Sequence, residues 1–174
     1  EIGLDVHNKP DSEEICFIPD DDHGKFIRER EPDKVKPGYF VDENGNVLGK
    51  HKGVVNYTIG QRKGLGVSLG KRVFVQDIIP ETNTVVLGDE DKLFNKALYA
   101  EDVNIIPYEK IPEYLSVTAK IRYGTKESEA IVKPYRDGIL VEFKTPQRAI
   151  TKGQSVVMYD KDLVIGGGTI VEIL

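Results

Sequence analysis

Hydrophobic and polar positions alternate through most of the chain after residue 37, and this pattern predicts short β-strands. Residues 39–41 and 47–48 are expected to pair as a hairpin, because residues 43–46 contain Asn-Gly, a strong turn signal. Residues 72–79 and 84–87 are expected to form a second hairpin across a polar turn. The segment up to residue 96 is therefore predicted to be mostly β-structure.

The same alternation continues to the end of the chain, with turn signals at regular intervals, which predicts a small barrel or sandwich. The expected strands are residues 98–106, 115–123, 128–134, 138–143, 154–159 and 163–173. Three consecutive glycines, Gly166 to Gly168, lie inside the last of them. They predict a bulge or a close backbone approach rather than a phosphate cradle, because no helix follows them.

Residues 1–36 show no such alternation and are interpreted as a connector with one short helix. The run Asp20-Asp21-Asp22 offers N-cap side chains for a helix through Phe26 and Arg30, which should end before Pro32. The whole chain is thus predicted to be mainly β.

Composition narrows the class of protein. The chain has 174 residues, of which 39% are hydrophobic, so we expect a folded globular protein without a membrane span. One cysteine excludes an internal disulfide framework, and with three histidines it gives no structural zinc site at the usual spacing. The first residues do not resemble a signal peptide, and without an initiator methionine we expect the chain to be a piece of a longer protein.

Charge is distributed unevenly along the chain. The net charge is −5, yet residues 36–76 carry seven basic and two acidic side chains. Within them, residues 49–66 combine five glycines with Lys50, Lys52, Arg62 and Lys63, and with His51, which is potentially basic. Tyr57 adds a ring that can stack on a base. Two interpretations stay open for this stretch, a glycine-rich hairpin with a solvated basic face and a surface for anions or nucleic acid.

Cys16 is the only thiol, and its neighbours do not make it reactive. It lies between Ile15 and Phe17, as a small buried hydrophobic residue would. Acidic residues on both sides disfavour a thiolate, whereas reactive cysteines need the opposite field.

Several motifs occur in an order that resembles the C-terminal half of the MnmA family of bacterial tRNA-specific 2-thiouridylases. They are Ile15-Cys16-Phe17-Ile18-Pro19, Gly49-Lys-His-Lys-Gly53, Tyr57-Thr-Ile-Gly-Gln-Arg-Lys-Gly-Leu-Gly66, Ile121-Arg122-Tyr123, Pro146-Gln147, Gly153-Gln154 and Gly166-Gly-Gly168. The resemblance covers essentially the whole chain. It implies a connector with a short helix over residues 1–36, a small central β-rich domain over 37–95 and a C-terminal antiparallel β-barrel over 96–174.

The resemblance also implies a cytoplasmic sulfurtransferase that acts on the wobble uridine of tRNA. In this family ATP adenylates the C2 oxygen, a cysteine persulfide delivers sulfur and AMP leaves. Cys16 matches the cysteine that carries the persulfide, whose remaining thiol can close a disulfide with a partner cysteine. This sequence lacks that partner cysteine and the Ser-Gly-Gly-x-Asp-Ser phosphate loop of the N-terminal ATP-pyrophosphatase domain. ATP is therefore expected on the missing domain, no metal is expected, and this chain alone is predicted to be inactive.

The family pattern places tRNA contacts on Arg122, Tyr123 and Gln154. An arginine beside a tyrosine offers a phosphate fork and a stacking ring, and a glutamine amide can donate and accept. Adjacent residues of a regular strand point to opposite faces, so we expect a strand end or a bulge at Gly124. The alternatives from the residues alone are a surface ion pair for Arg122 and a core ring for Tyr123.

The expected partners are tRNA, a sulfur-donor protein and the missing ATP-pyrophosphatase domain, with no membrane. Lys50, Lys52, Arg62 and Lys63 are expected to seat the tRNA or to hold the catalytic domain. Two other functions stay open, a non-enzymatic RNA-binding β module in which Cys16 is structural, and a protein-interaction barrel without an RNA role.

Overall fold

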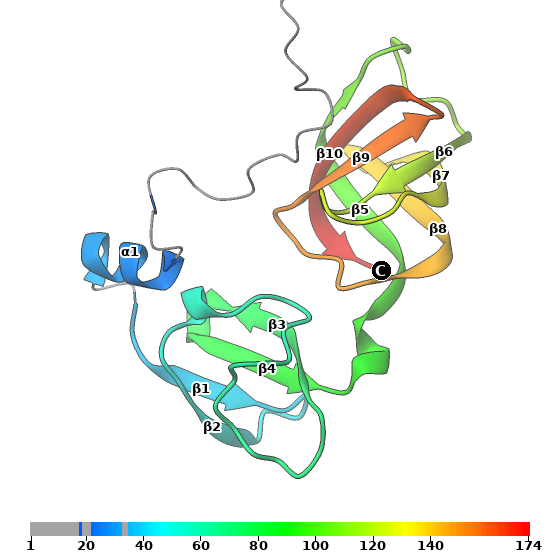
Figure 1. Ribbon diagram of the computed structural model, residues 1–174. Coiled ribbons are helices and arrows are strands. Elements are labelled where there is room, and N and C mark those ends of the chain that lie inside the picture. Colours follow the sequence, from blue (N-terminus) through cyan, green and yellow to red (C-terminus); the bar gives the residue numbers. More distant parts are fainter. Residues whose placement is uncertain (1–17, 19–21, 33–34) are drawn as a thin grey trace, which may run out of the picture.

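The computed structural model describes residue 18 and residues 22–32 and 35–174 (Figure 1). The chain forms two β units, a small sheet and a barrel, and helix α1 lies beside the small sheet (Figure 1). The mainly β fold predicted from the sequence, with a closed antiparallel barrel in the second half, is confirmed. Cys16 lies outside the described residues, and the domain boundaries after residues 36 and 95 stay predictions.

Helix α1 (His23–Arg30) begins where the sequence places its cap. The Asp22 side chain accepts a hydrogen bond from the Lys25 backbone N–H at 2.7 Å, which satisfies one of the free N–H groups of the first turn. The helix packs on the short 3₁₀ turn η2 (Val54–Asn56), where Arg28 donates to the Asn56 side chain at 3.1 Å. This contact ties α1 to the glycine-rich basic stretch.

The small sheet has four strands in the order β2-β1-β4-β3, namely β1 (Gly38–Val41), β2 (Val47–His51), β3 (Phe74–Ile79) and β4 (Thr84–Gly88). Both predicted hairpins are present, and the 3₁₀ turn η3 (Pro80–Thr82) closes the second. Strand β1 pairs with β4 in parallel, so the sheet is mixed. Phe40, Val75 and Val85 are fully buried in its core.

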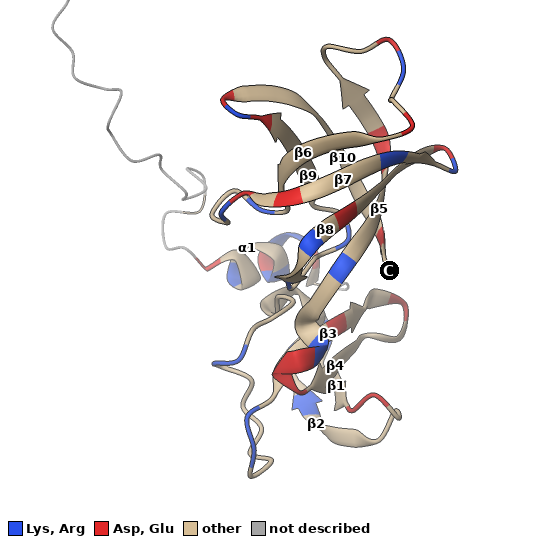
Figure 2. Cartoon of the chain, turned by 90° about the vertical axis from the view of Figure 1, so that its right-hand side faces the viewer, with Lys and Arg blue, Asp and Glu red and all other residues tan. Residues whose placement is uncertain are grey.

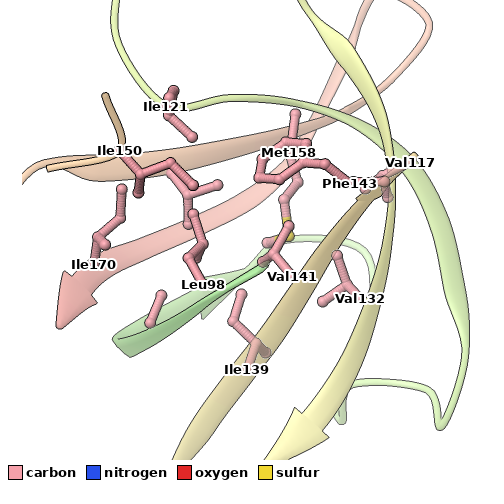
Figure 3. Packing of buried hydrophobic residues seen from close by; sticks show 14 of the residues in the cluster. Leu98, Val117, Ile121, Val132, Ile139, Val141, Phe143, Ile150, Met158 and Ile170 are labelled. Carbon is pink, nitrogen blue, oxygen red and sulfur yellow. The ribbon is translucent and has the colours of Figure 1, made fainter. Parts of the chain in front are cut away.

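The barrel has six strands in the closed order β10-β5-β8-β7-β6-β9. They are β5 (Phe94–Ile105), β6 (Leu115–Lys120), β7 (Ser128–Tyr135), β8 (Gly138–Arg148), β9 (Ser155–Asp160) and β10 (Leu163–Ile173). Alternate residues point inward and meet in one apolar core, in which Leu98, Val141 and Met158 are completely buried (Figure 3). Closure leaves no strand edge of this barrel unpaired.

Among the strand ends that differ from the sequence prediction, those of β6 and β8 matter for the site. Strand β6 ends at Lys120 rather than at residue 123, and β8 continues to Arg148, five residues beyond the predicted end. The extra part of β8 pairs with the start of β5, as in the register of Phe94 with Arg148. Proline favours a turn, but the pairing with β5 keeps Pro146 within strand β8.

The glycine triplet of β10 lies where two backbones approach closely, as the sequence predicts. A side chain on Gly166 would clash with the Asn104 carbonyl group, and the register shifts on both sides of the triplet. Gly166 also has a φ of 156°, so only glycine fits this crossing.

The two β units meet through a small apolar cluster. The 3₁₀ turn η4 (Glu90–Leu93) leads from the sheet into β5, and Leu93 packs with Phe74 and Ala149, against which Ile59 also lies. The Ala149 backbone N–H donates to the Leu93 carbonyl at 2.8 Å. The start of the barrel is therefore fixed against the sheet.

Candidate nucleic-acid interface

The outer face of strands β6 and β9 carries a hollow with a volume of about 1200 Å³. Strand β6 pairs with β9 in the register of Lys120 with Val157. Inward-pointing Ala119 and Met158 are buried, so their neighbours along each strand face outward. We call this hollow the β6–β9 groove. Its lining residues are Lys120, Ile121, Arg122, Tyr123, Gly124, Gly153, Gln154, Ser155, Val157 and Tyr159.

Arg122 and Tyr123 lie in the turn that follows β6. The turn is closed by Thr125, whose backbone N–H and hydroxyl donate to the Arg122 carbonyl at 3.2 and 2.8 Å. The strand ends at Lys120, earlier than the expected end or bulge at Gly124. Both side chains reach the same groove because the alternation of the strand no longer applies. Tyr123 is 73% exposed, which rules out the core-ring interpretation.

The Arg122 guanidinium group is held by neutral acceptors. Its Nη2 donates to the Thr151 hydroxyl at 2.7 Å, to the Ala149 carbonyl at 3.0 Å and, more weakly, to the Ile59 carbonyl at 3.4 Å. Within the described part of the chain, no carboxylate forms a salt bridge with Arg122. Among these residues, Arg122 has neutral hydrogen-bond partners and no ion pair.

The charge of Arg122 is partly desolvated without being neutralised. Burial, and then the nearby charge of Arg148, lowers the pKa of Arg122. A guanidinium group keeps its proton at neutral pH even so. A half-buried cation with only neutral partners favours an anion beside it.

Gln154 is oriented by the same arginine. Its Oε1 accepts from Arg122 Nε at 3.1 Å, which assigns the other end of the amide as a donor. No acceptor for Nε2 is found among residues 22–32 and 35–174. Gln154 therefore offers an N–H group at the groove, suited to an oxygen of RNA.

Lys50, Lys52, Arg62 and Lys63 are exposed, but none of them lines the β6–β9 groove. Arg62 and Lys63 lie at the tip of the 58–64 loop. The Gln61 side chain braces this loop, accepting from the Thr58 N–H at 2.9 Å and donating to the Lys63 carbonyl at 3.0 Å. Figure 2 shows lysine and arginine segments on the loops around the small sheet.

The 58–64 loop also connects the small sheet to the groove. Arg122 donates to the Ile59 carbonyl, and Arg148 Nη2 donates to the Gly60 carbonyl at 3.2 Å. The first pair is separated by 63 positions in the sequence and the second by 88, and both pairs meet where the two β units join. Neither contact carries a local sequence signal.

The structure corrects the prediction that His51 is a potentially basic side chain of the 49–66 stretch. Its ring is only 3% exposed, with Nδ1 accepting from the Gly53 N–H at 3.0 Å and Nε2 3.1 Å from the Asn83 carbonyl. This pair of partners fixes the neutral tautomer with its hydrogen on Nε2. Burial lowers the pKa of His51, so it is a core residue rather than a basic one.

Tyr57, expected to offer a stacking ring, is partly buried in the core of the small sheet. Its ring packs edge-on against Phe40 and His51, with centroid distances of 5.1 and 5.5 Å. Gly38 leaves room for the His51 ring, because a Cβ atom at this position would lie 2.7 Å from the ring carbon Cε1. Tyr57 therefore stabilises the small sheet.

Sequence reasoning missed Tyr159 as a lining residue of the groove. The alternation in 154–159 does place Val157 and Tyr159 on one face. Knowing which strand lies beside that face requires the β6–β9 pairing, which closes the barrel and is not visible locally.

The described residues contain no group of three side chains suited to a metal ion, and none of their helices has the length and hydrophobicity of a membrane span.

Two family models match the chain. One, described as tRNA methyl transferase PRC-barrel domain, covers residues 24–89, and the other, described as aminomethyltransferase beta-barrel domain, covers residues 95–170. They coincide with the small sheet and the barrel.

Curated relatives match over almost the whole chain. The tRNA-specific 2-thiouridylase MnmA of Clostridium beijerinckii is 61% identical over 100% of this chain and 49% of its own length. Proteins of the same name from Clostridium perfringens and Acetivibrio thermocellus are 59% and 57% identical, over 100% and 98% of this chain and 49% and 48% of their own lengths. The chain spans about half the length of the curated relatives it matches.

Proposed function

Because this chain belongs to the MnmA family of tRNA-specific 2-thiouridylases, we propose that it is the tRNA-binding part of an enzyme that thiolates the wobble uridine. The observation that carries this proposal is the half-buried Arg122, held by neutral acceptors in a groove whose described lining residues include no acidic one. Such a groove suits the phosphates of RNA.

Each groove residue has a role in this proposal. Arg122 supplies positive charge close to a phosphate, and Tyr123 offers an exposed ring on which a base can stack. Gln154, oriented by Arg122, donates its amide N–H to a sugar, phosphate or base oxygen.

The basic side chains of the small sheet form a second contact region in the proposal. Lys50, Lys52, Arg62 and Lys63 are exposed, and the braced 58–64 loop presents two of them beside the groove. They attract the RNA backbone without reading its sequence.

The chemistry that we propose follows the family. The C2 oxygen of the uridine attacks ATP and is adenylated with release of pyrophosphate, in the part of the enzyme that lies outside this chain. The terminal sulfur of a persulfide on Cys16 then attacks C2 and AMP leaves. A partner cysteine thiolate next attacks the Cys16 sulfur, so that a disulfide forms and the thiocarbonyl stays on the uridine. A sulfur-donor protein restores the persulfide after a reductant reopens the disulfide.

A thiolation assay with the complete protein tests this proposal. Cys16→Ser should abolish thiolation and leave tRNA affinity unchanged, since Cys16 acts in sulfur transfer only. Tyr123→Ala with Gln154→Ala should raise the KM for tRNA about tenfold, the effect of losing one stacked base, while the KM for ATP stays the same. Thiolation by the Cys16→Ser protein would favour a non-enzymatic role for this chain instead.

A further inference from the structure

The end of the β6–β9 groove away from the Arg122 turn is formed by Tyr159 and Lys120. Tyr159 lies opposite Thr118 in the pairing of β9 with β6, and it shares the outer face with Val157. The Lys120 Nζ lies 5.4 Å from the centroid of the Tyr159 ring, within the range of a cation–π contact. Both side chains are half-buried.

Lys120 is held in place from its other side. Its Nζ lies 3.5 Å from a Glu127 oxygen, and the second oxygen of that carboxylate accepts from the Thr118 hydroxyl at 2.7 Å. The ammonium charge is therefore balanced locally, in contrast to that of Arg122. At this end of the groove the ring, rather than the charge, is the group best suited to a ligand.

The groove has room for more than one nucleotide. Its volume of about 1200 Å³ exceeds that of an ordinary small-molecule pocket, roughly 300–1,000 Å³. Lys120 lies at the end of β6 and Arg122 in the turn that follows, so the groove extends from the paired strands into this turn. A strand of RNA can thus contact both ends, whereas a single base fills only one.

We propose that Tyr159 is a second stacking site for RNA, at which an unpaired nucleotide packs on its ring while Arg122, Tyr123 and Gln154 hold the adjoining part of the strand. Lys120 positions the ring through the cation–π contact. This inference rests on the proposed RNA-binding function of the groove and adds the class of ligand, a single-stranded segment. Two tyrosines and the cation of Arg122, with no acidic side chain among the described lining residues, fit such a segment better than a protein surface.

The absence of tryptophan from this chain allows a direct test. Tyr159→Trp places one indole at the proposed site, and a stacked base quenches indole fluorescence. We expect titration with tRNA, and with a short unstructured RNA oligonucleotide, to quench the fluorescence of this variant. Tyr108→Trp is the matched control, because Tyr108 is exposed and does not line the groove, and its fluorescence should stay constant.

Affinities of three further variants separate the possible contacts. Tyr159→Ala should weaken oligonucleotide binding about tenfold, the effect of losing one stacked base, whereas Tyr159→Phe should bind as the unaltered chain does. An equal loss in Tyr159→Phe would show a hydroxyl contact and overturn stacking. Unchanged binding by Tyr159→Ala, with weaker binding by Tyr123→Ala, would overturn this inference and leave the proposed function standing. If Tyr159→Ala and Tyr123→Ala both bind as the unaltered chain does, and circular dichroism shows both variants folded, this inference and the proposed function are overturned together.

Discussion

At the scale of single residues, Arg122 joins the groove to the rest of the molecule. One guanidinium group reaches the Gln154 amide, the Thr151 hydroxyl and two backbone carbonyls, one of them in the small sheet. A planar fork of donors can do this, whereas the single ammonium of lysine cannot.

We therefore expect Arg122→Lys to destabilise the chain by about 1–3 kcal/mol, because partly buried acceptors lose their donors. Urea unfolding measures this change. Arg72→Lys is the control, since Arg72 is exposed and does not line the groove. Equal stability of the Arg122→Lys and Arg72→Lys chains would contradict the role given to Arg122.

His51 predicts a pH dependence of stability. Burial lowers its pKa below the ordinary value of 6.5, so the unfolded chain takes up a proton at a pH where the folded chain does not. Stability contributed by neutral His51 is complete above pH 6.5 and falls as the pH drops from 6.5 through the lowered pKa. The free energy of unfolding should decrease between about pH 7.5 and 5.5 more steeply for the unaltered chain than for His51→Gln. Identical slopes would show that His51 is not held neutral.

At the scale of elements, the 58–64 loop depends on the backbone conformation of Gly60 and on its close packing against the barrel. Gly60 has a φ of 83°, and a Cβ atom there would lie 3.0 Å from the Ala149 Cβ, across the junction with the barrel. Gly66 has a similar φ of 71° and nothing within 4 Å of such an atom. A side chain would strain the backbone at both positions, because both have a positive φ. Only at Gly60 would it also meet a close neighbour.

Gly60→Ala should thus destabilise the chain more than Gly66→Ala, for which the left-handed backbone alone costs about 1–2 kcal/mol. Thermal unfolding of the two variants gives the comparison. Equal costs would mean that packing between the loop and the barrel contributes nothing.

Local patterns predicted the elements well, because alternation, caps and turns act over a few residues. The Asp22 cap of α1, the two hairpins and the glycine crossing at Gly166 all follow from such signals. The parallel pairing of β1 with β4, the burial of His51 and the contact of Arg122 with Ile59 arise from segments far apart in the sequence. Local patterns cannot report these contacts. Arg122, Tyr123 and Gln154, which line the groove, came from the family resemblance and not from a local pattern.

At the scale of the whole molecule, the positive regions gather although the chain is acidic. The net charge is −5, yet the described lining of the groove has no acidic residue and the adjoining 58–64 loop carries Arg62 and Lys63. Binding of a polyanion depends on such a local field more than on the total charge.

Charge reversal at the loop tip tests this view. Arg62→Glu with Lys63→Glu should weaken tRNA binding and reduce the salt slope by roughly 0.7–0.9 for each phosphate that the loop no longer neutralises. Lys110→Glu with Lys161→Glu is the control, since it makes the same change in total charge at exposed barrel positions outside the groove. Equal weakening of binding in the two double variants would mean that total charge, rather than the loop, governs binding.

The most direct test of the central claim is the equilibrium binding of tRNA to this chain at low and at moderate salt. We predict binding that weakens as salt rises and that weakens further in the Arg122→Ala, Gln154→Ala variant, because the groove provides part of tRNA recognition by itself. The absence of binding at low salt, or binding that this variant leaves unchanged, would contradict the account.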